Sequence, residues 1–299
     1  GNYNLKLFKE NLDFKFGRPK HSSKNCISFG FSGILENYKI DLISDLDETF
    51  KSKIILGDQD IKDTLYYWYN SIKELDSLKF VVRNNDLIDT MSVKLRNSNI
   101  DSLKIKPLQN NYISFLDNIQ FHANTPFEEI DTTKISLINK DSLNVDFKIS
   151  LDTLQNIYSF NFEKLEEEDY KFQFLPGSFT DLYNTTNDTL NYSYKTKTYD
   201  DYGNLRLTLR NVNYPAIVQL TTKTGEVKYE KTMSSQGNID FKHVIPNKYY
   251  VRVILDKNKN GKYDPGKYLS NYYSERVSHL DEELDIRAGW DLVQEFILK

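Results

Sequence analysis

The chain has 299 residues, and its 39 Lys and Arg against 43 Asp and Glu give a formal net charge of -4. This balance offers no overall positive field to phosphate groups, so we expect no nucleic-acid partner. No stretch reaches the roughly 18 consecutive apolar residues that a membrane helix needs. The single cysteine, Cys26, excludes an internal disulfide and any multi-cysteine metal cluster.

Aromatic residues make up 14% of the chain, with 21 Tyr and 18 Phe, and short apolar runs alternate with clusters of Asn, Asp, Ser and Thr. Rings and β-branched side chains suit a pleated, half-buried surface, and the polar clusters serve as turns. No interval shows a sustained helical period. A chain of this length can hold two or three separate cores. The sequence therefore predicts an all-β fold of tandem antiparallel β-sandwich (Ig-like) domains.

The first predicted domain spans residues 1–100. Apolar and polar residues alternate there in short segments, which predicts closely spaced strands and a sandwich. The expected strands are residues 5–8, 13–16, 26–31, 38–43, 64–69, 77–82 and 89–95. The nearby acidic spread of Asp58, Asp60 and Asp63 has no glycine-turned ligand register, and we expect a solvated loop.

The strand at 64–69 carries rings on both of its faces. A half-exposed strand should carry large rings on one face, so we expect both faces of this strand to be covered. Packing within the chain, a neighbouring domain, a partner or a sugar would each account for the second face. Packing within the chain is the simplest interpretation, because large rings mostly serve cores.

The second predicted domain spans residues 101–199 and follows a polar junction. The same alternation predicts a second sandwich. Its expected strands are residues 102–105, 112–115, 118–122, 134–138, 145–149, 157–162, 170–174 and 188–196.

The third predicted domain spans residues 200–299 and opens at Gly203. Its segments are again short, and a hairpin turn is expected at residues 223–226. The expected strands are residues 205–209, 216–220, 227–229, 239–241, 249–255, 268–269, 283–287 and 290–298.

The strand at 249–255 runs into an oxygen-rich loop in which Gly261 holds the sixth position. Positions 1, 3, 5 and 9 of an EF-hand-type loop converge on Ca²⁺, and all four carry oxygen-bearing side chains here. Position 12 is Lys267 instead of the bidentate Glu, so a calcium ion would need a further oxygen from elsewhere in the fold. The alternative is an Asx-turn loop whose side chains cap their own backbone. The candidate calcium ligands are Asp256, Asn258, Asn260 and Asp264.

Motifs on either side of this loop carry a resemblance to a known family. Pro246-Asn-Lys-Tyr249 precedes the strand, and Ile286-Arg-Ala-Gly-Trp-Asp291 follows the loop. With the loop, they resemble the last domain of Ig-like-domain lipoproteins of Bacteroidota, which looks like a transthyretin-like or carboxypeptidase-regulatory-like sandwich. Asn247, Tyr263 and Gly289 stand where that pattern has Gly, Trp and Asn. Because Asn tolerates positive φ, we expect the turn at Asn247 to form.

Two further segments are similar to the same lipoproteins. Leu175-Pro-Gly-Ser-Phe-Thr-Asp181, with the strand that ends at Thr196, resembles the closing strands of an SbsA-type bacterial Ig-like domain, and residues 7–20 resemble an internal segment. The resemblance implies an N-terminally longer native protein with a signal peptide, a lipidated cysteine and at least one more domain. It also implies attachment to the outer membrane, on its periplasmic or cell-surface face, through that lipid anchor alone.

No motif of a catalytic centre stands out in the sequence. The four histidines form no His-x-x-x-His pair, and there is no G-x-S-x-G elbow, no P-loop and no G-x-G-x-x-G after a strand. A glycosidase carboxylate pair can come from distant strands, but such enzymes seldom use small Ig-type sandwiches. We therefore expect a non-enzymatic protein.

Two functions fit these expectations. The first is an adaptor or scaffold that presents Ig-like domains to another envelope protein, such as a β-barrel complex in assembly, secretion or motility, because free sheet edges can add a partner strand. The second is a calcium-assisted carbohydrate-binding surface module that uses rings as stacking platforms. The candidate residues of a partner or ligand surface are Tyr66, Trp68, Tyr272 and Tyr273.

Overall fold

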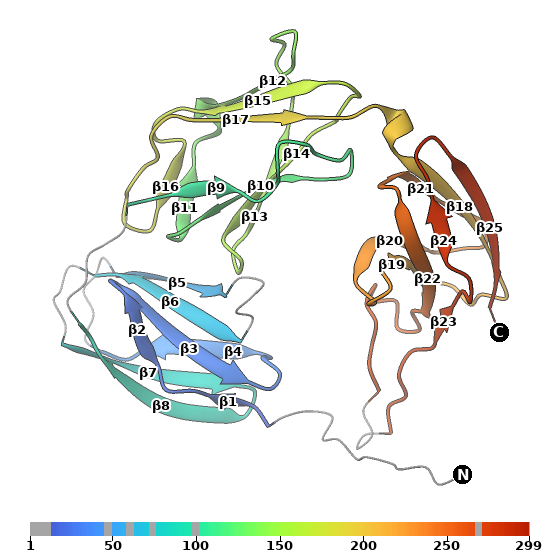
Figure 1. The fold of residues 1–299 in the computed structure, drawn as a ribbon. Helices are drawn as coiled ribbons and strands as arrows, with labels where there is room; N and C mark the ends of the chain where they lie inside the picture. Colours follow the sequence, from blue (N-terminus) through green and yellow to red (C-terminus); the bar gives the residue numbers. More distant parts are fainter. Residues whose placement is uncertain are drawn as a thin grey trace. The chain divides into compact units, whose positions relative to one another are not determined.

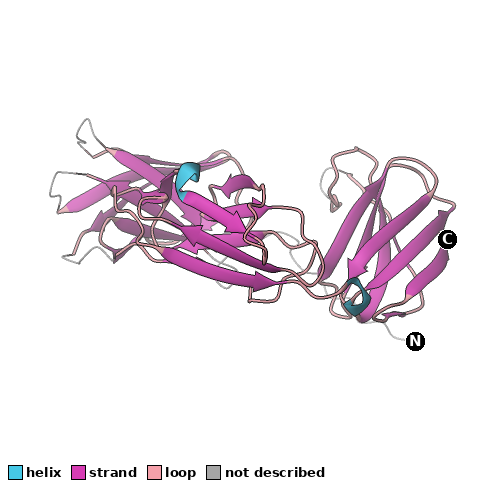
Figure 2. Cartoon of the chain, turned by 90° about the horizontal axis from the view of Figure 1, so that it is seen from above, coloured by secondary structure: helices cyan, strands magenta, loops and turns pink. Residues whose placement is uncertain are grey.

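A computed structural model describes residues 13–44, 50–57, 63–71, 76–96, 102–266 and 271–298. Over these residues the chain consists of strands and loops with two 3-10 turns, Thr132–Lys134 and Tyr199–Asp201 (Figure 2). The predicted all-β fold is confirmed. No helix among the described residues is long and apolar enough to cross a membrane.

The chain divides into two compact units. Unit 1 contains residues 1–111, 118–163 and 170–194, and unit 2 contains residues 112–117, 164–169 and 195–299. The strands themselves fall into three groups, at residues 15–94, 105–195 and 203–297. The predicted domain boundaries near residues 100 and 200 stay predictions.

The first sandwich lies in unit 1 and has two sheets (Figure 1). Its strands are β1 (Lys15–Phe16), β2 (Lys20–Ser23), β3 (Cys26–Ser32), β4 (Tyr38–Leu42), β5 (Lys51–Leu56), β6 (Thr64–Asn70), β7 (Ser77–Asn84) and β8 (Leu87–Lys94). One sheet has the order β1-β3-β6-β5, with β2 also on β3, and the other has the order β4-β7-β8. This is the ABED and CFG arrangement of a constant-type immunoglobulin sandwich. Phe29 and Tyr67 of the first sheet meet Phe80 of the second, with ring centroids 5.1 Å apart in both pairs.

The second sandwich repeats this arrangement. Its strands are β9 (Ile105–Pro107), β10 (Ile119–Ala123), β11 (Phe127–Ile130), β12 (Ile135–Ile138), β13 (Lys148–Asp152), β14 (Ile157–Asn161), β15 (Asp169–Phe174), β16 (Phe179–Asp181) and β17 (Leu190–Lys195). The sheets have the orders β13-β14-β10-β9 and β12-β15-β17, and β11 pairs with β16. Phe121 and Phe160 of the first sheet pack against Phe172 and Phe174 of the second, with centroids 4.9 to 5.9 Å apart. These four rings are buried and form the centre of the core.

The third sandwich lies in unit 2 and has a different strand order. Its strands are β18 (Gly203–Arg210), β19 (Ala216–Thr221), β20 (Val227–Met233), β21 (Asn238–Val244), β22 (Asn247–Leu255), β23 (Val277–His279), β24 (Leu284–Ile286) and β25 (Asp291–Ile297). One sheet has the order β21-β18-β25, and the other has β20-β19-β22-β23 with β24 also on β22. Strand β25 runs parallel to β18, which the purely antiparallel expectation missed. A parallel pair needs a long connection, and most of the sandwich lies between these two strands. The predicted transthyretin-like or carboxypeptidase-regulatory-like type stays a prediction.

Several short strands escaped the sequence prediction. Strands β2, β5, β11, β16 and β23 have no predicted counterpart. Strand β5 ends in Ile54, Ile55 and Leu56, which breaks the two-residue alternation, and β16 and β23 have only three residues each. Short or non-alternating strands give little periodic signal. The predicted strands at 5–8 and 268–269 lie outside the described residues.

The predicted strand at residues 112–115 is wrong. This segment makes one isolated bridge, between Tyr112 and Lys195, and then turns. The Ser114 N–H donates to Asp117 Oδ2 at 2.8 Å, a local bond that competes with a strand ladder. The Phe115 ring, which suggested a strand, instead packs 4.8 Å from the His243 ring in unit 2.

The ring layer of the second sandwich should dominate its stability. We expect Phe160→Ala to lower the free energy of unfolding by about 3 to 5 kcal/mol, because it opens a cavity between rings that touch it on several sides. Phe147, whose ring lies 5.6 Å from that of Phe160 but which is only half-buried, provides the matched control. Urea unfolding should show a clearly smaller loss for Phe147→Ala, and equal losses would contradict the packing described.

Candidate functional site

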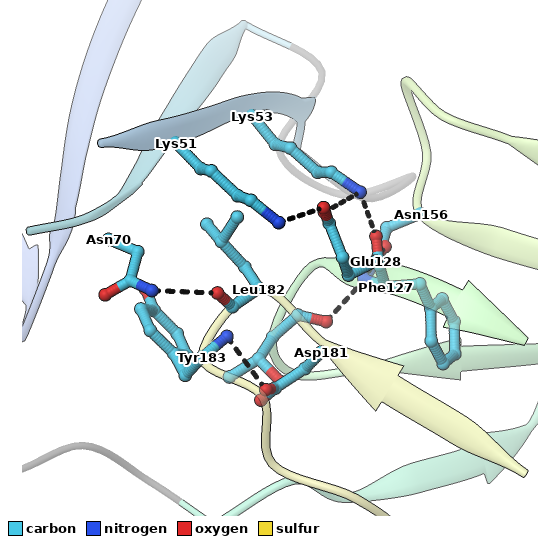
Figure 3. Close-up of polar contacts among 10 residues, drawn as sticks. Lys51, Lys53, Asn70, Phe127, Glu128, Asn156, Asp181, Leu182 and Tyr183 are labelled. Atoms are coloured by element: carbon cyan, nitrogen blue, oxygen red, sulfur yellow. Dashed lines mark hydrogen bonds and ion pairs between the residues drawn. The ribbon is translucent and has the colours of Figure 1, made fainter. Parts of the chain in front are cut away.

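A polar joint connects the first two sandwiches inside unit 1 (Figure 3). Lys51 and Lys53 lie on the same face of β5, because side chains two residues apart in a strand point the same way. Both reach Glu128 of β11: Lys51 Nζ lies 3.0 Å from Oε1, and Lys53 Nζ lies 2.7 Å from Oε2. Lys53 also donates to the carbonyl of Phe127. Two strands of different sandwiches are thereby held by one carboxylate.

Backbone groups extend the joint beyond these ion pairs. The side chain of Asn70, at the end of β6, donates from Nδ2 to the carbonyl of Leu182 at 3.2 Å. The Leu56 N–H donates to the Leu154 carbonyl at 2.8 Å. A direct main-chain hydrogen bond between two domains depends on their close approach, so it adds geometric specificity to the charge pairs.

Two buried side chains shape the loops that the second sandwich contributes. Asp181 is fully buried; its Oδ1 accepts from the Tyr183 N–H at 2.9 Å, and its Oδ2 accepts from Thr125 Oγ1 at 2.8 Å. Asn156 accepts from the Phe127 N–H at 2.8 Å and donates to the Thr125 carbonyl at 2.9 Å. Buried polar groups that are fully bonded favour one arrangement of their surroundings. The loops that meet β5 and β6 are therefore pre-organised.

The ionisation of the joint follows from these contacts. Hydrogen bonding and attraction from Lys53 and Lys51 hold the pKa of Glu128 below its ordinary value. Burial raises the pKa of Tyr183, whose hydroxyl lies 3.4 Å from the Asn25 carbonyl, and burial raises the pKa of Cys26 to about 12. Cys26 is thus a buried, protonated thiol, as expected for a small core residue.

The rings of β6 lie on both faces of the strand, as the sequence predicted. Tyr67 and Tyr69 are buried in the core of the first sandwich, and Tyr66 and Trp68 lie half-buried on the opposite face. In the sheet register Trp68 stands beside Lys53. The candidate rings Tyr66 and Trp68 therefore share the sheet face that carries the joint.

The candidate calcium loop has the turned backbone that the sequence predicted, with φ of 73° at Gly261. The buried Asp256 begins the loop, and its two carboxylate oxygens accept from the Asn260 N–H at 3.1 Å and the Gly261 N–H at 2.8 Å. Asp264 Oδ2 accepts from the amide groups of Asn258 at 2.5 Å and Asn260 at 2.7 Å. The four candidate ligands thus lie together, in the hydrogen-bonded arrangement of the Asx-turn alternative.

A fifth oxygen-bearing side chain, which the sequence analysis missed, closes this loop. Glu275 is buried; its Oε1 accepts from the Lys257 N–H at 2.8 Å, and its Oε2 accepts from the Asp264 N–H at 3.1 Å. Its own N–H donates to the Asp264 carbonyl at 3.0 Å. Glu275 lies beyond the loop in sequence, so the EF-hand spacing gave no signal for it. Lys267, at position 12, lies outside the described residues.

The other candidate rings lie close to this loop in sequence. Tyr272 and Tyr273 precede Glu275 and are 45% and 87% exposed, so most of the Tyr273 residue reaches solvent. They belong to unit 2, whereas Tyr66 and Trp68 belong to unit 1. Over the residues that the structure describes, no group of three or more His, Cys, Asp or Glu has the arrangement of a metal site.

Comparisons with known proteins return only distant likenesses. No protein-family model matches the chain, and no curated protein matches it. Domains 5–6 of the S-layer protein SbsC are 13% identical over 58% of this chain and 89% of that chain, with a TM-score of 0.23. The I9–I11 tandem of titin is 9% identical over 95% and 100%, with a TM-score of 0.21. The Bacillus anthracis TIE protein is 9% identical over 98% and 58%, with a TM-score of 0.22. Because these TM-scores are low, the likenesses carry no argument about the fold. The fold is defined by the strand order of the structure itself.

The joint should loosen when Glu128 loses its charge. Glu128→Gln keeps the shape of the side chain but weakens both ion pairs, by about 1 kcal/mol in total. Spin labels at Lys94→Cys and Lys148→Cys, one in each sandwich, should then show a broader distance distribution by pulsed electron paramagnetic resonance. Glu129→Gln, at the exposed neighbouring position, is the control and should leave the distribution unchanged. An unchanged distribution in Glu128→Gln would show that the ion pairs do not hold the joint.

The same distribution should depend on pH. Because the pKa of Glu128 is lower in the folded protein than its ordinary value of 4.5, the ion pairs contribute stability above pH ~4.5 and lose it as the pH falls through the folded pKa. The parent protein should therefore approach the Glu128→Gln distribution on acidification, and the variant itself should change little over that range.

Proposed function

We propose that this chain is part of a non-enzymatic adaptor of the bacterial outer membrane, which presents its β-sandwiches to another envelope protein. In this proposal an N-terminal lipid anchor outside the present sequence tethers the protein, and the partner is a β-barrel complex in assembly, secretion or motility. The observation that carries the proposal is the joint between the first two sandwiches, because ion pairs and pre-organised loops hold two binding modules at one spacing.

The mechanism is positional. An adaptor that connects a membrane anchor to a partner must keep the two at a defined distance. A flexible linker would not keep that distance. The buried Asp181 and Asn156 hold the loops of the joint in one arrangement before a partner binds. Binding therefore costs little conformational entropy for ordering these loops. The sheet edges of such modules supply free main-chain donors and acceptors for a partner strand.

Affinity capture from the native envelope tests the adaptor. A lipid-anchored, full-length bait should recover one envelope protein in a stoichiometric amount after solubilisation in detergent. The joint variant Glu128→Gln should recover it less well if spacing matters, and Glu129→Gln should match the parent. A bait that recovers no envelope protein, or only abundant proteins in substoichiometric amounts, would contradict the proposal.

We also propose that the loop at 256–264 binds Ca²⁺, with Glu275 in place of the missing carboxylate at position 12. The proximity of Glu275 to Asp264 supports this, because it supplies the oxygen that the EF-hand spacing lacks. Binding would require the amides of Asn258 and Asn260, which now donate to Asp264, to turn their oxygens inward.

Calcium should then stabilise unit 2. At a free Ca²⁺ concentration of 100 times Kd, a single site adds about 2.7 kcal/mol and raises the melting temperature. The double variant Asp256→Ala with Asp264→Ala should abolish the rise, and Glu275→Gln should reduce it. Calorimetry with Mg²⁺ instead of Ca²⁺ provides the control, since Mg²⁺ disfavours such a loop. A parent protein whose melting temperature does not respond to Ca²⁺ has an Asx-turn loop and no calcium site.

A calcium-assisted carbohydrate-binding function is the second candidate. The strongly exposed ring of Tyr273, two residues before Glu275, favours it, because a sugar stacks on an accessible ring beside a calcium site. Glycan-array binding should disappear with Tyr273→Ala and with a chelator. Binding that survives both changes, or an array without a signal, argues against this function.

A further inference from the structure

The first and the last strand of the third sandwich are neighbours in one sheet (Figure 1). Strand β25 runs parallel to β18 over seven register pairs, from Asn204 opposite Asp291 to Arg210 opposite Ile297. In a parallel pair, the start of one strand and the end of the other lie at opposite ends of the ladder. The chain therefore enters this sandwich at one end of the ladder and leaves it at the other end.

Main-chain hydrogen bonds close the ladder at both of its ends. At the start, the Asn204 N–H donates to the Trp290 carbonyl at 2.9 Å. At the finish, the Leu298 N–H donates to the Arg210 carbonyl at 3.0 Å. In a parallel pair the bonds between such points are evenly spaced along the strands. The two terminal strands are thus bonded along the whole length of β25.

Tension on the two ends of this sandwich pulls β18 and β25 past each other along their length. Hydrogen bonds that are loaded in this direction share the force, so several of them must break together. Bonds that are pulled apart from one end of a ladder break one after another. The rate of unfolding governs forced unfolding, and each further bond that must break at the same moment slows that rate by about fivefold.

The core of the sandwich opposes the same sliding. Leu205, Leu207 and Leu209 of β18 are buried in it, together with Phe296 of β25. Because a protein interior is closely packed, these side chains cannot move along the strand axis without leaving the spaces that they fill. Sliding would also expose part of their apolar surface to water. Packing therefore adds to the resistance of the ladder.

The first sandwich has no such ladder over its described residues. There β1 pairs with β3, whereas β8, the last strand, pairs with β7 in the other sheet. The pairing of β1 is short: Lys15 lies opposite Ser32, and Phe16 lies opposite Phe31. Within the described part of this sandwich, tension at its ends meets no main-chain ladder between the first strand and the last.

The second sandwich is intermediate. The chain just after β9 meets the end of β17 at one isolated parallel bridge, between Tyr112 and Lys195. The Ile113 N–H donates to the Lys195 carbonyl at 3.0 Å. This parallel contact is one pair long, against seven pairs in the third sandwich. The three sandwiches therefore differ in how directly their terminal strands are bonded.

We propose that the third sandwich is a load-bearing module, and that the parallel ladder of β18 and β25 is the element that resists tension between its two ends. This function goes beyond the proposed adaptor role, because it depends on strand order and not on any partner. A protein that connects two bodies transmits force through the ends of its chain. A sandwich of this kind stays folded when the two bodies are drawn apart.

Pulling the same sandwich in two directions tests the inference. In a Cys26→Ala background, handles at Asp200→Cys and Ile297→Cys load the ladder along its length. Handles at Asn213→Cys, just beyond the end of β18, and Ile297→Cys peel β25 from β18. All three handle positions are exposed. At equal force in optical tweezers, the folded lifetime should be on the order of a hundredfold longer under lengthwise load, the factor for about three bonds that break together instead of singly.

A matched pair of proline variants tests the ladder itself. Leu298 directs its N–H toward β18, and by alternation Gln294 does the same, whereas Val293 directs its N–H away. Gln294→Pro removes a bond of the ladder, so it should shorten the lifetime under lengthwise load by about fivefold or more relative to Val293→Pro. Under peeling load the two variants should differ less, because peeling starts at the Leu298 end.

Equal lifetimes of the parent ladder in the two directions would overturn the inference. Equal lifetimes of Gln294→Pro and Val293→Pro under lengthwise load would overturn it as well. The comparison of directions uses the parent ladder, so it decides the matter even if Gln294→Pro does not fold. No partner takes part in these measurements. Their failure would leave the adaptor function standing, and a bait that captures no envelope protein would leave the load-bearing ladder standing.

Discussion

The aromatic layer between the two sheets of each Ig-type sandwich is the constraint on which the rest of unit 1 depends. Phe29, Tyr67 and Phe80 fix the spacing of the sheets in the first sandwich. Once Tyr67 occupies the core, strand alternation sends the Tyr66 ring to the opposite face. The same rule places Lys53 of β5 on that outer face, where its ammonium group reaches Glu128. The core thus determines which side chains are available for the joint.

The joint combines charge with shape. A surface ion pair by itself contributes little, because salt screens it and two long side chains must be ordered. Here one carboxylate meets two lysines beside loops that buried Asp181 and Asn156 already hold, so little further ordering is needed. That combination holds the first two sandwiches at one spacing, which is what the proposed adaptor function requires. It differs from a catalytic arrangement, in which charge would converge on a cleft that admits substrate.

The third sandwich contributes a different property, an unequal protection of its edges. Lys231 bridges the two sheets on one side, whereas β25 on the other side exposes Val293 and Ile297, with Glu295 between them paired to Arg210. An edge of this kind is an aggregation hazard in a protein that has no use for it.

The sequence by itself determined the fold class, the ring-bearing strand at 64–69 and the turn at Gly261, because each depends on local alternation or on one backbone conformation. It did not locate β5, β11 or the turn at 112–117, where apolar runs lack a clean period or a local Asp117 bond replaces a ladder. The tertiary structure alone brought Glu128 to Lys53, and Glu275 to Asp264. The first contact joins residues far apart in the chain, and the second joins a loop to a residue 11 positions beyond its aspartate, outside the EF-hand register, so residue spacing gave no signal for either. The same holds for β25, whose position at an edge depends on the pairing of all the strands before it.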